Sequence, residues 1–336
     1  MKTAAAFINE NAQNRMSDAF DAKTRAALRE TLDLPDEVVL SADLEENRER
    51  LAKTVYLFST WGMPPLTEAQ IREYFPSLKA VFYAAGSVQH FARPFLNCGV
   101  KVFSAWAANG VPVAEYTVAQ IVLAGKGFFQ GLRIQEKEGR AAFKAYSDSF
   151  PCNYNTKVGI LGAGMIGSLV LKMLGGYAFE KLVYDPFASD EKLAALGARR
   201  ASLEEIFSEC QTVSNHIANL PATQRMLRYE HFSRMGRNAT FINTGRGAQV
   251  VEEDLIRALR EEPGRTALLD VTWPEPPKAD SPLWTMPNVI LTPHIAGSMN
   301  NEIARMGSYM AEEYAALREG RPCRYEVTEK MLETMA

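Results

Sequence analysis

Residues 157–185 read KVGILGAGMIGSLVLKMLGGYAFEKLVYD and decide the fold of this chain. A short apolar run at 158–161 breaks into Gly162, Gly164 and Gly167, a helix-like run continues to Leu174, and a second apolar run at 182–184 ends on Asp185. Because a strand, a glycine turn, a helix and a second strand follow in this order, the stretch predicts a βαβ unit that binds a dinucleotide rather than a bare glycine-rich turn.

Each glycine of this stretch has a separate steric role. Gly162 permits the tight turn, Gly164 leaves room for a pyrophosphate against the backbone, and Gly167 lets the helix pack closely on the strand. The phosphates then bind at the helix N-terminus, which begins with Met165 and Ile166. Asp185 is placed to accept hydrogen bonds from an adenosine ribose and to repel a 2′-phosphate, which predicts NAD rather than NADP.

Length and composition limit what surrounds this unit. With 336 residues, 47% hydrophobic and 23% charged, we expect two soluble globular domains. The net charge of −3 leaves no basic surplus for nucleic acid. No apolar run approaches 18 residues and the N-terminus turns polar early, so we predict a cytoplasmic protein that does not contact membranes. The four cysteines lack CxxC spacing, which indicates buried or incidental thiols and no metal site.

The chain before the glycine stretch predicts a lobe of its own. Short apolar strands are expected at 4–8, 55–59, 78–84 and 100–104, with a helix at 17–32 and another that begins at Thr67 with a capping box to Gln70. This alternation is typical of a doubly wound sheet without a phosphate-binding fingerprint. The loop containing Gly86, Ser87 and Val88 follows the third strand, so its amides either hold an anion or form an ordinary glycine turn.

Two further segments precede the glycine stretch. Residues 109–135 predict one long helix that begins near Pro112 and carries an apolar face, so it either crosses between lobes or packs against another subunit. Residues 139–156 lose their periodicity and predict a loop.

Three segments after the glycine stretch carry candidate catalytic groups. Arg246 follows a strand at 239–243, and His294 follows a strand at 289–291. A strand at 267–271 carries Asp270, and Glu275 comes five residues after Asp270. Because parallel strands bring their carboxyl ends to one edge, we expect an arginine, an acid and a histidine to meet beside the cofactor. His216 ends a strand at 212–215 and either lines the cofactor cleft or is structural.

At these residues the chain resembles the NAD-dependent D-isomer-specific 2-hydroxyacid dehydrogenase family over nearly its whole length. The matching motifs are VGILGAGMIG, INTGRGAQVVEEDLIRAL, LLDVTWPEPP and PLWTMPNVILTPHIAG. The resemblance implies an α/β protein with two doubly wound parallel-sheet domains, a Rossmann NAD-binding domain at 106–297 inserted into a flavodoxin-like substrate domain at 1–105 and 298–336. It also implies a homodimer.

The resemblance implies a role for each motif residue. Arg246 binds the substrate carboxylate and acts in catalysis, His294 is the acid and base, and Glu275 favours its protonated form. The amides of Gly86, Ser87 and Val88 complete the substrate site. Asp270 contacts the nicotinamide end of the cofactor. We also expect Thr244 to bind the cofactor, and His216 as well if it lines the cofactor cleft.

The implied function is hydride transfer between NAD(H) and a small 2-keto or D-2-hydroxy acid. The family's pattern is broken at Ala218, where a proline is frequent, and at Gln89 and His90 in the substrate loop. The alternative is an NAD(H)-sensing binding protein, because the C-terminal-binding-protein corepressors share this fold. The absence of appended tails or basic patches favours the enzyme.

Overall fold

The computed structural model describes residues 2–333, which form two compact units. One unit comprises the chain up to Gly110 together with the chain from Ser298 onward, and the other is Val111–Gly297. Residue 1 and residues 334–336, which the sequence assigned to the substrate domain, lie outside the described residues. Nowhere in residues 2–333 is a helix both long and apolar enough to cross a membrane.

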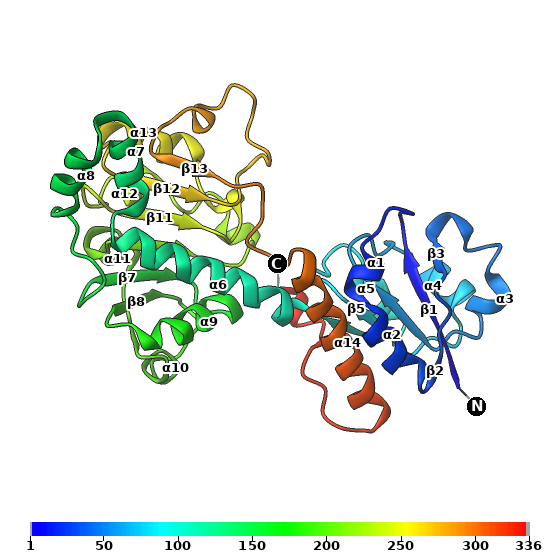
Figure 1. Ribbon diagram of the computed structural model, residues 1–336. Helices are drawn as coiled ribbons and strands as arrows, with labels where there is room; N and C mark the ends of the chain where they lie inside the picture. Colours follow the sequence, from blue (N-terminus) through cyan, green and yellow to red (C-terminus); the bar gives the residue numbers. More distant parts are fainter. Residues whose placement is uncertain (1, 334–336) are drawn as a thin grey trace. The chain divides into compact units, whose positions relative to one another are not determined.

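The first unit is built on a parallel sheet that includes β1 and β5 (Figure 1). One edge strand of this sheet, β14, is antiparallel. Within the described residues the strand order is β14-β6-β5-β4-β1-β2, and β3 also pairs with β1. The strands are β1 (Thr3–Asn9), β2 (Leu32–Asp33), β3 (Val38–Leu40), β4 (Tyr56–Ser59), β5 (Ala80–Tyr83), β6 (Lys101–Ser104) and β14 (Glu326–Val327). The helices are α1 (Met16–Ala19), α2 (Ala22–Arg29), α3 (Arg48–Leu51), α4 (Glu68–Tyr74), α5 (Ala92–Asn97) and α14 (Ile303–Arg318).

Both faces of this sheet are buried. Ala6 and Ile8 of β1 belong to the core that α3, α4 and α5 cover, whereas Ala5 and Phe7 belong to the core that α1, α2 and α14 cover. The alternation follows from the two-residue period of a strand. Helix α14 approaches α1 so closely that a Cβ on Gly307 would lie 1.8 Å from the carbonyl oxygen of Ala19. The C-terminal segment therefore completes the first unit.

The second unit is a parallel sheet in the order β13-β12-β11-β10-β7-β8-β9 (Figure 1). Its strands are β7 (Lys157–Leu161), β8 (Glu180–Tyr184), β9 (Ala198–Arg200), β10 (Thr212–Asn215), β11 (Thr240–Asn243), β12 (Thr266–Leu269) and β13 (Val289–Leu291). Its helices are α7 (Phe128–Glu138), α8 (Arg140–Ser147), α9 (Met165–Met173), α10 (Asp190–Ala195), α11 (Leu203–Glu209), α12 (Tyr229–Phe232) and α13 (Glu252–Glu261). The chain enters this unit within α6 (Trp106–Gly125).

The strand order of the second unit reverses at β7. From β7 the chain first builds outward through β8 and β9, and it then returns to the other side of β7 to add β10, β11, β12 and β13. Helices α6, α9 and α10 cover one face, where Ile160 and Val183 are buried, and α11, α12 and α13 cover the other, where Leu161 and Leu182 are buried. Open parallel sheets bind ligands at such a reversal, beyond the carboxyl ends of the strands.

Three local predictions were wrong. The helix expected at 17–32 is two short helices, because Asp21 accepts a hydrogen bond from the Thr24 amide and caps α2. The helix expected at 109–135 begins earlier, at Trp106, has Pro112 in its interior, and breaks at Gly127, whose φ is +66°. The loop expected at 139–156 contains α8.

Candidate active site

The glycine turn between β7 and α9 has the geometry of a phosphate-binding loop. Gly162 has φ +89°, and a Cβ there would lie 2.8 Å from the carbonyl oxygen of His216. A Cβ on Gly167 would lie 1.9 Å from the carbonyl oxygen of Gly162, whereas one on Gly164 would meet no atom within 4 Å among the described residues. Two glycines are therefore required by packing, and the third leaves open space at the start of α9.

The N-terminus of α9 faces this open space without a side-chain cap. The amides of Met165, Ile166 and Gly167 belong to the first turn of the helix, where amides lack an intrahelical acceptor. Together with the positive end of the helix dipole, they form a site suited to a phosphate.

Asp185, directly after β8, holds the glycine loop and its own loop together. Its Oδ2 accepts a hydrogen bond of 2.7 Å from the Ala163 amide, and its Oδ1 accepts bonds of 2.8 and 3.0 Å from the amides of Phe187 and Ala188. The carboxylate is therefore fixed at the ribose end of the predicted dinucleotide site.

His216 follows β10 beside the glycine loop. Its Nε2 lies 2.9 Å from Ser214 Oγ, and its buried Nδ1 has no hydrogen-bond partner within residues 2–333. Burial lowers the pKa of His216 to about 4, so the imidazole is neutral at pH 7. Its contact with a cofactor stays a prediction.

Arg246 projects from the turn after β11. Its Nη1 donates to the carbonyl oxygen of Gly245 at 2.9 Å, and burial lowers its pKa while the charge of Glu275 acts in the opposite direction. A Cβ on Gly247 would lie 2.0 Å from the backbone carbon of Thr272, so the turn needs a glycine after Arg246. The guanidinium is thus a half-buried cation at the carboxyl edge of the sheet, next to an acid.

A buried network of three amide side chains shapes this turn, and the sequence analysis missed it. Asn215 Nδ2 donates to Asn243 Oδ1 at 3.1 Å and to Gln249 Oε1 at 2.7 Å. Asn243 in turn accepts from the Gly245 amide and donates to the carbonyl oxygen of Arg246, each at 3.1 Å. The sequence feature that could have indicated this network is an asparagine at the end of each of the apolar strands β10 and β11.

In the structure, Asp270 stabilises the loop that carries His294. Its Oδ1 accepts from Thr292 Oγ1 at 2.6 Å and from the Ile295 amide at 2.8 Å, and its Oδ2 accepts from the Ala296 amide at 2.9 Å. The carbonyl oxygen of Asp270 also accepts from the His294 amide at 3.1 Å. The predicted contact of Asp270 with the cofactor therefore stays a prediction beside an observed structural role.

Helix α6 forms hydrogen bonds with the loop after β13 and with the turn after β11. Tyr116 Oη donates to Thr292 Oγ1 at 3.4 Å, and the hydroxyls of Thr117 and Thr244 lie 3.0 Å apart in a buried hydrogen bond. Thr244, predicted to contact the cofactor, is thus buried and paired with the helix.

His294 and Glu275 form the central pair of the site. His294 Nδ1 lies 2.7 Å from Glu275 Oε1, and both side chains are partly exposed. The backbone of His294 has φ +55°, an unusual value for a residue other than glycine, and strained residues of this kind cluster at functional sites. Because Nδ1 is engaged, Nε2 is the nitrogen available to a substrate.

Gly86, Ser87 and Val88 lie after β5 in the first unit. Ser104 Oγ donates to the carbonyl oxygens of Ala85 and Gly86 at 2.9 and 2.6 Å, which holds the turn. Within residues 2–333 the amides of Gly86, Ser87 and Val88 donate no hydrogen bond; Gly86 and Ser87 are accessible to solvent, whereas Val88 is buried.

The sequence model described as "D-isomer specific 2-hydroxyacid dehydrogenase, NAD binding domain" matches residues 123–296, more than half of the chain. The chain belongs to this family. Membership confirms the predicted family and the predicted NAD cofactor. The family's chemistry is NAD-dependent hydride transfer on 2-keto and 2-hydroxy acids, so the alternative of an NAD(H)-sensing binding protein is not favoured.

Individual relatives agree with this assignment. The chain is 29% identical to a glyoxylate reductase of Korarchaeum cryptofilum over 255 residues. This aligned region covers 75% of this chain and 77% of the reductase. It is 28% identical to a D-3-phosphoglycerate dehydrogenase of Archaeoglobus fulgidus over 68% of this chain. That match spans only 43% of the archaeal dehydrogenase, so the chain corresponds to less than half of it.

The solved structure of a phosphoglycerate oxidoreductase from Rhizobium etli confirms the predicted fold class. It superimposes with a TM-score of 0.78 at 22% identity and covers 97% of this chain and 99% of its own.

The residues of the second unit of this dehydrogenase-family protein fit NAD. The open space at Gly164, the uncapped first turn of α9 and the acid at the end of β8 provide, in order, room for the pyrophosphate, donors for its oxygens and an acceptor for the ribose. Groups of three or more His, Cys, Asp or Glu side chains able to hold a metal ion are not found among the described residues.

Proposed function

We propose that the protein reduces a small 2-keto acid to the D-2-hydroxy acid, or catalyses the reverse oxidation, with His294 as proton donor and acceptor. The observation that carries the proposal is the 2.7 Å hydrogen bond between His294 and Glu275 at the same sheet edge as Arg246. NAD(H), when bound, supplies or accepts the hydride. The remaining steps are binding, orientation and proton transfer by side chains.

His294 delivers the proton in this scheme. Glu275 holds Nδ1 and fixes the orientation of the ring, and Nε2 gives its proton to the substrate oxygen as that oxygen gains electron density. Asp270 supports the step indirectly, because its carboxylate holds the amides of residues 295 and 296 and keeps the His294 loop in place.

Arg246 binds the substrate carboxylate and polarises the ketone. Its planar guanidinium offers paired donors with the geometry of a carboxylate. Half-burial strengthens this attraction because less water screens the charge. We also propose that the amides of Gly86, Ser87 and Val88, which donate no hydrogen bond within residues 2–333, bind the substrate carboxylate.

A substrate panel tests the proposal. NADH oxidation is followed with 2-keto acids that range from glyoxylate, suggested by the name of one relative, to acids with larger side chains. The expected result is turnover of at least one acid with formation of the D-enantiomer wherever the product is chiral. Tight NADH binding with turnover of none would contradict the proposed activity and favour a sensor.

We further propose that the protein is a cytoplasmic homodimer. Leu123, Phe128 and Leu132, near the end of α6 and on α7, expose between 38% and 47% of their surface, which supports an interface on these helices. The expected result in sedimentation at micromolar concentration is a dimer that Leu132→Glu converts to monomer. A wild-type monomer of 37.3 kDa would contradict the proposal.

A further inference from the structure

Asp185 does not stand alone at the ribose end of the cofactor site. Its carboxylate receives three backbone amides, from Ala163, Phe187 and Ala188. These bonds fix its position and partly offset its charge, because each amide directs a positive dipole end toward it. The repulsion that Asp185 exerts on a 2′-phosphate is therefore weaker than that of an unpaired carboxylate.

Lys192 of α10 brings a positive charge to the same loop. Its Nζ donates to the carbonyl oxygen of Ala163 at 2.7 Å, and Ser168 Oγ donates to that oxygen at 2.8 Å. The Lys192 amide is held as well, by Ser189 Oγ at 3.2 Å. Since the Ala163 amide bonds Asp185, one residue of the glycine loop anchors both the acid and the ammonium.

Lys192 keeps capacity for another ligand. An ammonium carries three donors, and within residues 2–333 the carbonyl oxygen of Ala163 is the one hydrogen-bond acceptor of Nζ. The residue is exposed, so an incoming anion reaches the remaining donors without displacing a protein partner.

Arg200 adds a second cation that holds the loop after β8. Its Nη1 and Nη2 donate to the carbonyl oxygens of Asp185 and Ala188, and its Nε lies 2.8 Å from Asp190 Oδ1. All three nitrogens thus bind the segment that carries the ribose acid. This bonding makes Arg200 a positioning residue.

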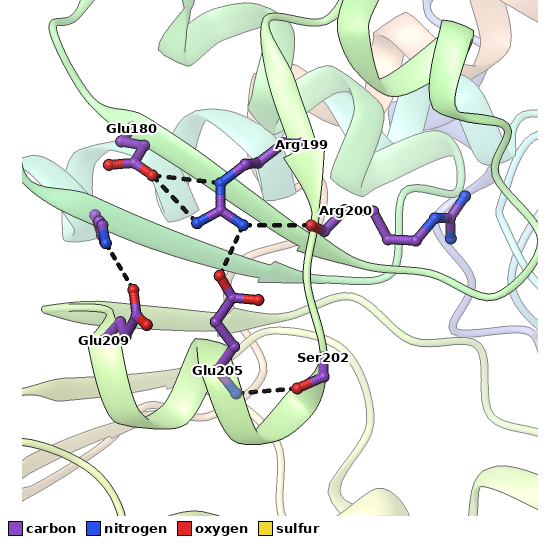
Figure 2. Close-up of polar contacts among 7 residues, drawn as sticks. Glu180, Arg199, Arg200, Ser202, Glu205 and Glu209 are labelled. Atoms are coloured by element: carbon purple, nitrogen blue, oxygen red, sulfur yellow. Dashed lines mark hydrogen bonds and ion pairs between the residues drawn. The ribbon is translucent and has the colours of Figure 1, made fainter.

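The neighbouring Arg199 provides a contrast. Figure 2 shows Arg199 turned toward Glu180 and Glu205, while the Arg200 side chain extends away from this acidic cluster. Consecutive strand residues point to opposite faces of a sheet. Arg199 of β9 therefore contacts surface acids, whereas Arg200 contacts the loop after β8.

We propose that Lys192 is a second determinant of cofactor choice, which opposes Asp185 by offering its ammonium to a 2′-phosphate while Arg200 holds the loop in place. The inference rests on the proposed NAD site. Its consequence is that the preference for NADH over NADPH is limited: Asp185 increases the preference and Lys192 decreases it. Proteins of this fold that accept NADP bind the 2′-phosphate with a cation near the ribose.

Binding of adenosine 2′,5′-bisphosphate and of ADP to the full chain, measured by calorimetry, separates the two contributions. The first nucleotide carries the 2′-phosphate and the second lacks it. Lys192→Met keeps the apolar stem and removes the charge, so it is expected to weaken the bisphosphate about three- to tenfold, the size of one partly exposed charge-assisted contact. The affinity for ADP is expected to change less than about twofold on the same scale.

Lys172→Met is the matched control. Lys172 is an exposed lysine in the last turn of α9, so this substitution changes the net charge equally but leaves the loop intact, and both affinities are expected to stay the same. Raising the salt concentration is expected to shrink the effect of Lys192→Met, because salt screens exposed charges.

Three outcomes would overturn the proposal. Equal loss for both nucleotides in Lys192→Met would assign Lys192 a purely structural role, no loss for either would remove it from the site, and an equal effect of Lys172→Met would reduce the result to net charge. Failure of the wild-type protein to bind ADP at all would instead refute the proposed cofactor site, so the two failures are distinguishable. Thermal unfolding of each variant verifies that it is folded.

Discussion

Replacing Gly164 and Gly167 by alanine, one at a time, separates folding from cofactor binding. A methyl group on Gly167 would lie 1.9 Å from the carbonyl oxygen of Gly162, whereas ordinary contact begins near 3.4 Å. The helix and the turn must therefore separate by about 1.5 Å, and both sides of this contact are backbone. Overpacking usually costs about 1–3 kcal/mol, and we expect the upper end here because no flexible side chain can yield.

Gly164→Ala is the control for folding and the probe for binding. Its φ is −65°, outside the left-handed region that favours glycine, and a Cβ there meets no atom within 4 Å among the described residues. The free protein should therefore lose less than about 1 kcal/mol. The methyl group would instead occupy the space assigned to the pyrophosphate, so the affinity for NADH should fall at least about tenfold.

The assay is thermal unfolding without ligand, combined with NADH titration by fluorescence. For a unit of this size, Gly167→Ala should lower the Tm by about 6–12 °C, since each kcal/mol shifts the Tm by about 2–4 °C. Undiminished NADH affinity in Gly164→Ala would refute the assignment of the pyrophosphate site. An unchanged Tm in Gly167→Ala would show that the contact between Gly167 and Gly162 is not as close as described.

Two further predictions concern Arg246 and His216. Arg246→Lys should raise the KM for the 2-keto acid about tenfold or more and leave the Kd of NADH unchanged, because one ammonium replaces a two-pronged donor; an unaltered KM would place the carboxylate elsewhere. Burial lowers the pKa of His216 from 6.5 to about 4. Between these two pH values the unfolded chain binds a proton at His216 and the folded chain does not, so stability falls as the pH drops from 6.5 towards 4. Between pH 7 and pH 5 this group lowers the free energy of unfolding by up to about 2 kcal/mol. Denaturant unfolding of His216→Gln should show a pH dependence that is smaller by this amount. An equal pH dependence in both proteins would contradict the burial of a neutral imidazole.

The sequence predicted the glycine loop and the strand ends well because their requirements are local. Gly162 needs its positive φ for the turn itself, and Gly167 has no room for a Cβ because the carbonyl oxygen of Gly162 lies there, so both requirements appear in the spacing of the glycines. The apolar strands before Arg246 and His294 are likewise visible as runs of residues, and parallel topology brings their ends to one edge.

The features that the sequence could not predict depend on partners far away in the chain. The break at Gly127 and the formation of α8 are linked to packing, since a Cβ on Gly127 would lie 2.5 Å from the ring of Phe150 and one on Gly131 1.9 Å from the ring of Phe143. The bonds of Asn243 to Asn215 and of Lys192 to Ala163 join segments about 30 residues apart. The residues next to Asn243 and Lys192 in the sequence do not indicate which distant residues they bind.

The most direct test of the proposed chemistry compares NADH oxidation by the wild-type protein and His294→Ala with the best 2-keto acid of the panel. Loss of the proton donor should lower kcat by about 10²- to 10⁴-fold, while the Kd of NADH, measured on the same preparation, stays within about twofold. Wild-type turnover in His294→Ala would contradict the account, because the proton would then come from another group and the pair of His294 with Glu275 would not be the catalytic centre.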